Sequence, residues 1–197
     1  MLNRCANYLT DMMYKFCPLA HSSRPVYVYG FELLLSTGCS IASIIVLSAV
    51  FSLVHYALLF LGVFISLRLF NGGFHAKTYG KCFLVTNAVY LIVLSTSLFV
   101  QNIAQISIYR IGYLLITVSA ATVIYVLSPI KHVNHPLSER QYRHNQKIGR
   151  RLVVVIVVAN CILFFYPLPI INPVLISFTI VAVAMMMIIP QFTERRK

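Results

Sequence analysis

Residues 68–82 read RLFNGGFHAKTYGKC and lie between two strongly apolar segments. This short stretch contains three cations, three glycines, one histidine and one cysteine. A lipid-facing or core segment does not accept such a mixture without cause, because unpaired polar groups are costly in an apolar surrounding. We therefore expect residues 68–82 to connect two membrane helices, and we expect the chemistry of the protein at this connection.

The composition around this stretch is that of an integral membrane protein. Hydrophobic residues make up 59% of the 197 residues, the mean hydropathy is +0.84, and the chain has only four carboxylates. Soluble domains are usually about 45–50% apolar and about 25% charged. Since each membrane span needs ~20 residues, the sequence predicts an all-α integral membrane protein with about six transmembrane helices. Residues 1–197 are expected to form a single polytopic domain.

The sixteen lysines and arginines lie in the N-terminal segment, between the apolar segments and in the C-terminal tail. This placement follows the positive-inside rule, whereas a nucleic-acid-binding face would need a binding motif as well as basic charge. We therefore expect no nucleic-acid partner. With six spans and both termini in the cytoplasm, Arg110 is the only cation left on the outside, so topology and charge agree.

Along the chain, residues 1–25 mix apolar and charged side chains and are expected to form an amphipathic segment on the membrane surface. Pro18 and Pro25 should interrupt any helix that leads into the first span. The transmembrane bundle is expected over residues 31–190, and residues 191–197 should form a cytoplasmic tail. The first two spans should turn near Ser52 and His55. The predicted spans are 31–51, 54–70, 82–100, 108–128, 152–166 and 170–190.

Cys82 is the cysteine with a distinctive position, because it borders the polar connection instead of lying within a span. On one unbroken helix His75 and Cys82 would be separated by about 10.5 Å of rise, too far for a hydrogen bond. A Cys–His pair therefore requires a helix that starts between them, and Thr78 is a suitable N-cap. The helix dipole, with Lys77 and Lys81 nearby, would then favour thiolate over thiol. On residue types alone, two ordinary interface residues remain an alternative to a catalytic pair.

The pattern R-x-x-x-G-G-x-H-A-x-x-x-x-x-C resembles the signature of the accessory gene regulator protein B family, bacterial membrane peptidases that mature quorum-sensing propeptides. Its residues are Arg68, Gly72, Gly73, His75, Ala76 and Cys82. A second stretch, SPIKHVNHPLSE at 128–139, resembles the family's A-P-x-x-x-x-N-K-P-L segment. It departs from that segment at Ser128 and His135, which stand for the usual Ala and Lys, so a role for a lysine at the second position is in doubt.

The resemblance implies a multi-pass protein of the bacterial plasma membrane in which His75 and Cys82 form a catalytic dyad on the cytoplasmic side. It implies a cysteine endopeptidase that cuts a short autoinducer propeptide and holds part of it as a thioester. A substrate thiol then closes a thiolactone ring, or a hydroxyl a lactone. The backbone amides of Gly72 and Gly73 are candidate oxyanion donors. We expect no cofactor and no metal, and the family points to a homodimer.

Charged residues outside the dyad have two open readings. Glu32 is either an interfacial carboxylate facing water or a functional intramembrane group, and Arg68, Lys77 and Lys81 are expected to supply supporting charge near the dyad. The cytoplasmic loops carry further cations, which include Arg140, Arg143 and Lys147. These cations either bind anionic membrane lipids or also capture an acidic C-terminal tail of the propeptide.

A transporter or exporter of a small peptide or solute is the alternative function, since polytopic proteins with glycine-broken helices often move solutes. The sequence shows no internal repeat, and Glu32 is the only carboxylate near a span. These two observations favour the peptidase. Blocking Cys82 by alkylation distinguishes the two, because a transporter does not need that thiol.

Overall fold

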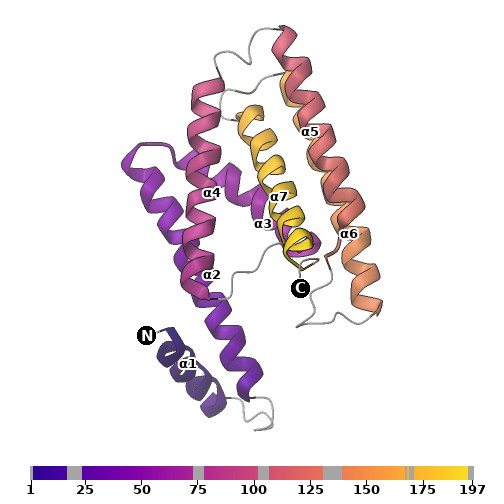
Figure 1. Ribbon diagram of the computed structural model, residues 1–197. Coiled ribbons are helices and arrows are strands. Elements are labelled where there is room, and N and C mark those ends of the chain that lie inside the picture. The colour runs from indigo at the N-terminus through magenta and orange to yellow at the C-terminus, as the bar shows by residue number, and fades with distance from the viewer. Residues whose placement is uncertain are drawn as a thin grey trace.

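The computed structural model describes residues 2–16, 24–72, 78–101, 107–130, 139–166, 168 and 171–194, except for the side chains of residues 107–110 and 190–194. Within these ranges the chain forms seven α-helices and no strand (Figure 1). The all-α prediction is confirmed. The helices are α1 (Leu2–Phe16), α2 (Arg24–Val50), α3 (Val54–Asn71), α4 (Tyr79–Val100), α5 (Ser107–Leu127), α6 (Glu139–Phe165) and α7 (Pro173–Glu194).

Four of the helices in these ranges, α2, α3, α4 and α6, are long and apolar enough to cross a membrane. Shorter apolar helical stretches lie in α5, at Ile111–Leu127, and in α7, at Pro173–Ile189. Many large apolar side chains on the outside of the bundle remain exposed, for example Leu91, Ile116 and Val158. Such an apolar exterior suits contact with lipid. Membrane helices are therefore confirmed, whereas a total of about six spans stays a prediction.

Helix α7 lies at the centre of the bundle and contacts α3, α4, α5 and α6 (Figure 1). Its Leu175, Ile180 and Met187 are almost completely buried. Helix α1 lies apart from this core and packs against α2. The arrangement separates an amphipathic N-terminal helix, Leu2–Phe16, from an apolar bundle, as expected for a membrane-surface segment.

Buried polar side chains link the helices inside the bundle. Ser48 of α2 and the Tyr90 hydroxyl of α4 share a hydrogen bond of 2.5 Å. Ser177 of α7 accepts hydrogen bonds from Thr117 of α5 at 2.8 Å and from Asn160 of α6 at 2.9 Å. Because an apolar surrounding offers no polar partners, such bonds between helices set the register of neighbouring helices.

The N-terminal helix boundaries differ from the predicted ones in two places. Helix α2 begins at Arg24, earlier than the predicted residue 31, and contains Pro25 in its first turn. Proline is tolerated there because its missing N–H has no helical partner to lose. The turn between α2 and α3 contains Ser52 with φ 58°, as predicted, but His55 lies inside α3.

The predicted spans 108–128 and 152–166 leave residues 129–151 as a cytoplasmic loop, and this prediction is wrong for residues 139–151. Helix α6 begins at Glu139, so Arg140, Arg143 and Lys147 lie on a helix. Residues 139–148 contain neither proline nor glycine, and a carboxylate in the first turn interacts favourably with the helix dipole. The predicted tail over residues 191–197 is likewise helical as far as Glu194.

Candidate active site

Helix α4 begins at Tyr79, between the two residues of the predicted dyad. Thr78 is its N-cap, with extended backbone at φ −136° and ψ 147°. The Thr78 hydroxyl accepts a hydrogen bond from the Lys81 N–H at 3.4 Å, and the Thr78 carbonyl accepts one from the Cys82 N–H at 3.1 Å. The prediction that Thr78 starts a helix upstream of Cys82 is therefore confirmed.

Cys82 lies in the first turn of α4 and is half-buried. It precedes the buried Thr86 by four residues, so both lie on the side of α4 that faces the bundle. The Thr86 hydroxyl donates to the Cys82 carbonyl at 2.9 Å. Within the described ranges the Cys82 thiol is free and has no hydrogen-bond partner. The thiol is thus positioned by a capped helix end while its sulfur stays available.

The other half of the predicted dyad lies outside the described residues. His75, together with Gly73 and Lys77, belongs to residues 73–77. The pairing of His75 with Cys82 therefore stays a prediction.

Gly72 ends α3 with a backbone conformation that favours glycine, at φ 75°. Its N–H donates to the Arg68 carbonyl at 3.0 Å and so closes the last turn of the helix. In this structure the Gly72 amide is therefore engaged in the helix cap and is not a free oxyanion donor. The Arg68 guanidinium lies 5.5 Å from the centre of the Phe64 ring, in a cation–π contact.

The residue before Gly72, Asn71, connects the two sequence motifs. Asn71 is completely buried, and its side-chain amide donates to the Leu67 carbonyl at 2.7 Å. Its side-chain oxygen accepts a hydrogen bond from the Ser128 hydroxyl at 2.6 Å, and its backbone carbonyl accepts one from the Ile130 N–H at 3.1 Å. The start of the SPIKHVNHPLSE stretch is thereby attached to the end of α3.

Helix α6 closes over this contact at Gly149, where α3, α5 and α6 meet. A Cβ at Gly149 would lie 3.0 Å from the Ser128 hydroxyl and 3.1 Å from Cγ of Asn71, and closer still to the Asn71 side-chain oxygen. Only glycine leaves room for this close approach of the α6 backbone. We call Asn71, Ser128 and Gly149 the motif junction.

Glu32 links three elements near the start of α4. One carboxylate oxygen accepts a hydrogen bond from the Asn3 side chain of α1 at 2.6 Å, and the other accepts one from the Tyr79 hydroxyl at 2.9 Å. Tyr79 is three residues before Cys82. Glu32, on α2, therefore connects α1 and the first turn of α4 through hydrogen bonds. The sequence left open whether Glu32 is an interfacial or a functional carboxylate, and the structure shows a structural link.

A hollow of about 180 Å³ lies beside this carboxylate, between α1, α2 and α4. Gly80 and Phe83, which flank Lys81 and Cys82 in sequence, contribute to its wall. The remaining lining residues are Leu2, Ser36, Cys39 and Tyr79. Its volume is enough for one side chain, and its lining is mostly apolar.

The cations predicted for substrate capture lie on the N-terminal half of α6. Arg143 forms an exposed ion pair with Glu139 at 3.9 Å, and Arg140 and Lys147 are also on this helix. Within the residues described, no group of three His, Cys, Asp or Glu side chains is close enough to hold a metal ion.

A family model for Accessory gene regulator B (AgrB) matches residues 2–190 of the chain. The chain belongs to the AgrB family. The match extends over nearly the whole chain, from α1 almost to the end of α7, and includes both motifs. No curated protein and no solved structure matched the chain. Family membership supports a role in the processing of quorum-sensing peptides, in agreement with the resemblance of residues 68–82.

Two residues of the motif junction in this AgrB-family chain were not predicted from the sequence. Asn71 lies inside the first motif pattern at an unspecified position, and Gly149 lies outside both patterns. Asn71 directly before two glycines was a signal for a buried cap, because asparagine often bonds to nearby backbone at helix ends. Gly149 gave no such signal, because residues 129–151 were predicted to be a loop, where glycine is common; its packing role depends on the helix that the structure shows.

Proposed function

We propose that the protein is a membrane-embedded cysteine endopeptidase that cleaves a short autoinducer propeptide at the cytoplasmic side. Cys82 is the nucleophile and His75 the general base. The Cys82 sulfur attacks the scissile carbonyl, and the amine of the C-terminal fragment leaves with the proton that His75 took from the thiol. The N-terminal fragment stays bound to Cys82 as a thioester.

The thioester retains the activation of the acyl group. A substrate thiol, or a hydroxyl for a lactone, attacks the thioester carbonyl and gives up its proton, and the Cys82 sulfur leaves. Ring closure therefore needs no ATP and no cofactor. A site at the edge of an apolar bundle limits access of water and so favours ring closure over hydrolysis.

The observation that carries this proposal is the position of Cys82. Its thiol is free among the described residues, it lies in the first turn of a capped helix, and the segment that contains His75 leads directly into that cap. Helix N-termini favour negative charge, which is the charge of an attacking thiolate.

The test is the cleavage of a synthetic propeptide by the full chain in proteoliposomes, followed by mass spectrometry. Cys82→Ala should abolish both cleavage and the acyl-enzyme, whereas the matched control Cys161→Ala should retain most activity. Cys161 is half-buried like Cys82 but lies near the far end of α6. Cleavage by Cys82→Ala at the rate of the parent protein would reject the nucleophile.

We further propose that Arg140, Arg143 and Lys147 capture an acidic C-terminal tail of the propeptide. Complementary charge raises the encounter rate and fixes the register of the peptide at Cys82. Arginine or lysine to glutamate at these three positions should weaken cleavage of an acidic-tailed peptide and partly restore cleavage of a basic-tailed one. Unchanged cleavage of the acidic-tailed peptide in correctly inserted protein would contradict this role.

The topology that we propose has six spans, with both termini in the cytoplasm of a bacterial cell. The positive-inside rule supports it, because the cationic half of α6 and residues 195–197 then lie on one side. Cysteines introduced at the two ends of the chain should be labelled by a membrane-impermeant reagent only after the cells are opened. Labelling of either end in intact cells would refute this orientation.

A further inference from the structure

Helix α6 changes from cationic to apolar at a single point. Its charged residues end at Arg150 and Arg151, and residues 152–165 carry no charged side chain. Because charged side chains avoid the hydrocarbon layer, the boundary between lipid headgroups and acyl chains lies beside these two arginines. A site at this level meets headgroups on one side and acyl chains on the other.

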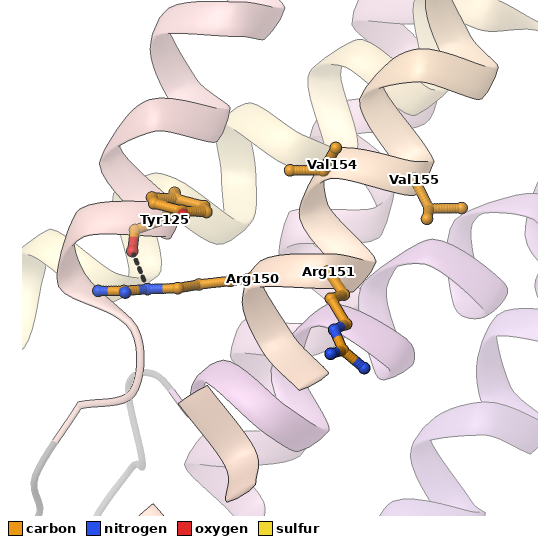
Figure 2. A pocket seen from close by; sticks show the side chains of 5 residues that line it. All are labelled: Tyr125, Arg150, Arg151, Val154 and Val155. Carbon is orange, nitrogen blue, oxygen red and sulfur yellow. Dashed lines mark hydrogen bonds between the residues drawn. The ribbon is translucent and has the colours of Figure 1, made fainter. Parts of the chain in front are cut away.

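A hollow of about 350 Å³ lies at this boundary, against the end of α5 (Figure 2). Tyr125 of α5 forms one wall. The remaining lining comes from α6, with Arg150 and Arg151 at the cationic end and Val154 and Val155 one turn further into the apolar half. The hollow therefore has a basic end at the headgroup level and an apolar end at the acyl-chain level. A lipid places its phosphate and its acyl chains in the same order.

Arg150 is held in place by Tyr125. Its Nε–H donates to the Tyr125 carbonyl at 3.2 Å, and the guanidinium carbon lies 4.8 Å from the centre of the Tyr125 ring, so the guanidinium lies flat beneath the ring (Figure 2). This contact uses one of the five N–H donors of the side chain. The terminal amino groups stay available to an anion, in a position fixed before binding.

Among the described residues, no carboxylate neutralises the positive charge of the hollow. Within the described ranges, the salt bridges are Arg24–Asp11 and Arg143–Glu139, and neither Arg150 nor Arg151 takes part in one. Arg151 is exposed on the adjacent position of the helix. Two neighbouring arginines at a headgroup boundary favour a phosphate-bearing group.

We propose that this hollow binds an anionic phospholipid. Its phosphodiester lies against the guanidinium of Arg150, near the charge of Arg151, and an acyl chain runs along Val154 and Val155. Free phosphate would use the arginines but gain nothing from the valines. An acidic peptide tail would also leave the apolar end unused, and the cations assigned to it, Arg140 to Lys147, lie nearer the start of α6.

The test is native mass spectrometry of the full chain in detergent, titrated with phosphatidylglycerol or with phosphatidylcholine. Phosphatidylglycerol should remain bound in preference to phosphatidylcholine. Arg150→Gln and Arg151→Gln should each weaken its binding about fivefold, the effect of one cation near a lipid surface. Arg140→Gln removes the same charge from the same helix outside the hollow and should leave binding unchanged.

Substitutions of Tyr125 provide a second test that leaves the charge of the hollow unchanged. Because Arg150 contacts the Tyr125 carbonyl and ring, Tyr125→Phe should bind phosphatidylglycerol as the parent protein does, whereas Tyr125→Leu should bind it more weakly. Thermal unfolding in detergent checks that each variant is folded.

Three results would overturn the proposal. An equal loss with Arg140→Gln would indicate diffuse attraction of anionic lipid to the whole helix. Displacement of phosphatidylglycerol by equimolar inorganic phosphate would indicate an anion site. Displacement by an acidic peptide, with equal binding of the two lipids, would indicate a peptide site.

Discussion

Replacing Gly149 by alanine tests whether the motif junction positions the candidate active site. The new Cβ would lie 3.0 Å from the Ser128 hydroxyl, 3.1 Å from Cγ of Asn71, and closer still to the Asn71 side-chain oxygen. Asn71 cannot move away freely, because it is completely buried and bonded to both Leu67 and Ser128. The substitution should therefore break the contact between Asn71 and Ser128.

The expected cost follows from three contributions. Overpacking of a closely packed site costs about 1–3 kcal/mol. Loss of the hydrogen bond between Ser128 and Asn71 adds about 1 kcal/mol. The better helix propensity of alanine offsets about 1 kcal/mol. The net destabilisation should be about 1–3 kcal/mol. Because Asn71 directly precedes the segment that leads to His75, displacement of that segment should lower the cleavage rate roughly a hundredfold.

The assay is propeptide cleavage in proteoliposomes, together with thermal unfolding in detergent. Gly62→Ala and Gly112→Ala are matched controls, because a Cβ at either position meets no atom within 4 Å. These controls should keep both activity and stability. Asn71→Ala removes the clashing atoms, so Gly149→Ala should cost less in an Asn71→Ala background than alone. Cleavage by Gly149→Ala at the parent rate, or additive losses in the double variant, would refute the coupling.

The remaining predictions concern the polar connection and its supports. His75→Gln should abolish cleavage, and the activity of the parent protein should fall at acid pH as the histidine becomes protonated. Normal accumulation of the acyl-enzyme in His75→Gln would contradict the role of His75 as general base. Thr78→Ala should lower the free energy of unfolding by about 1 kcal/mol and slow the alkylation of Cys82, and Thr78→Ser should restore both. Equal alkylation rates in Thr78→Ala and the parent protein would show that the cap does not affect the thiol. Tyr79→Phe should lower the melting temperature, because it removes a hydrogen bond to the Glu32 carboxylate that is worth about 1.5–3 kcal/mol. An unchanged melting temperature would show that the hydrogen bond from Asn3 is sufficient for this carboxylate.

The sequence by itself determined the class of the fold and the position of the candidate nucleophile, Cys82, at the start of a helix. Long apolar segments separated by cations predict membrane helices, because hydrocarbon accepts only backbone that is bonded within the segment. The start of α4 was also predictable, since Thr78 follows a glycine-containing connection and local capping needs no distant partner. Both inferences depend on interactions within a few residues.

The sequence did not predict where α6 begins. Its cationic half has no hydrophobic periodicity to mark it as part of a span, so residues 129–151 resembled a loop. The helix continues because residues 139–148 contain no helix breaker and its apolar half already fixes the axis. Propagation of an existing helix by one residue is far easier than nucleation of a new one.

Only the tertiary structure decided which distant residues meet. Asn71 and Ser128 are 57 positions apart, and the sequence around each of them does not predict that they are in contact. Their contact depends on the packing of α3, α5 and α6, with Gly149 as the point of closest approach. The contact between Glu32 and Tyr79 arises in the same way, from the packing of α2 against α4. Sequence periodicity shows which face of a helix is apolar, but the choice of neighbouring helix results from packing over the whole bundle.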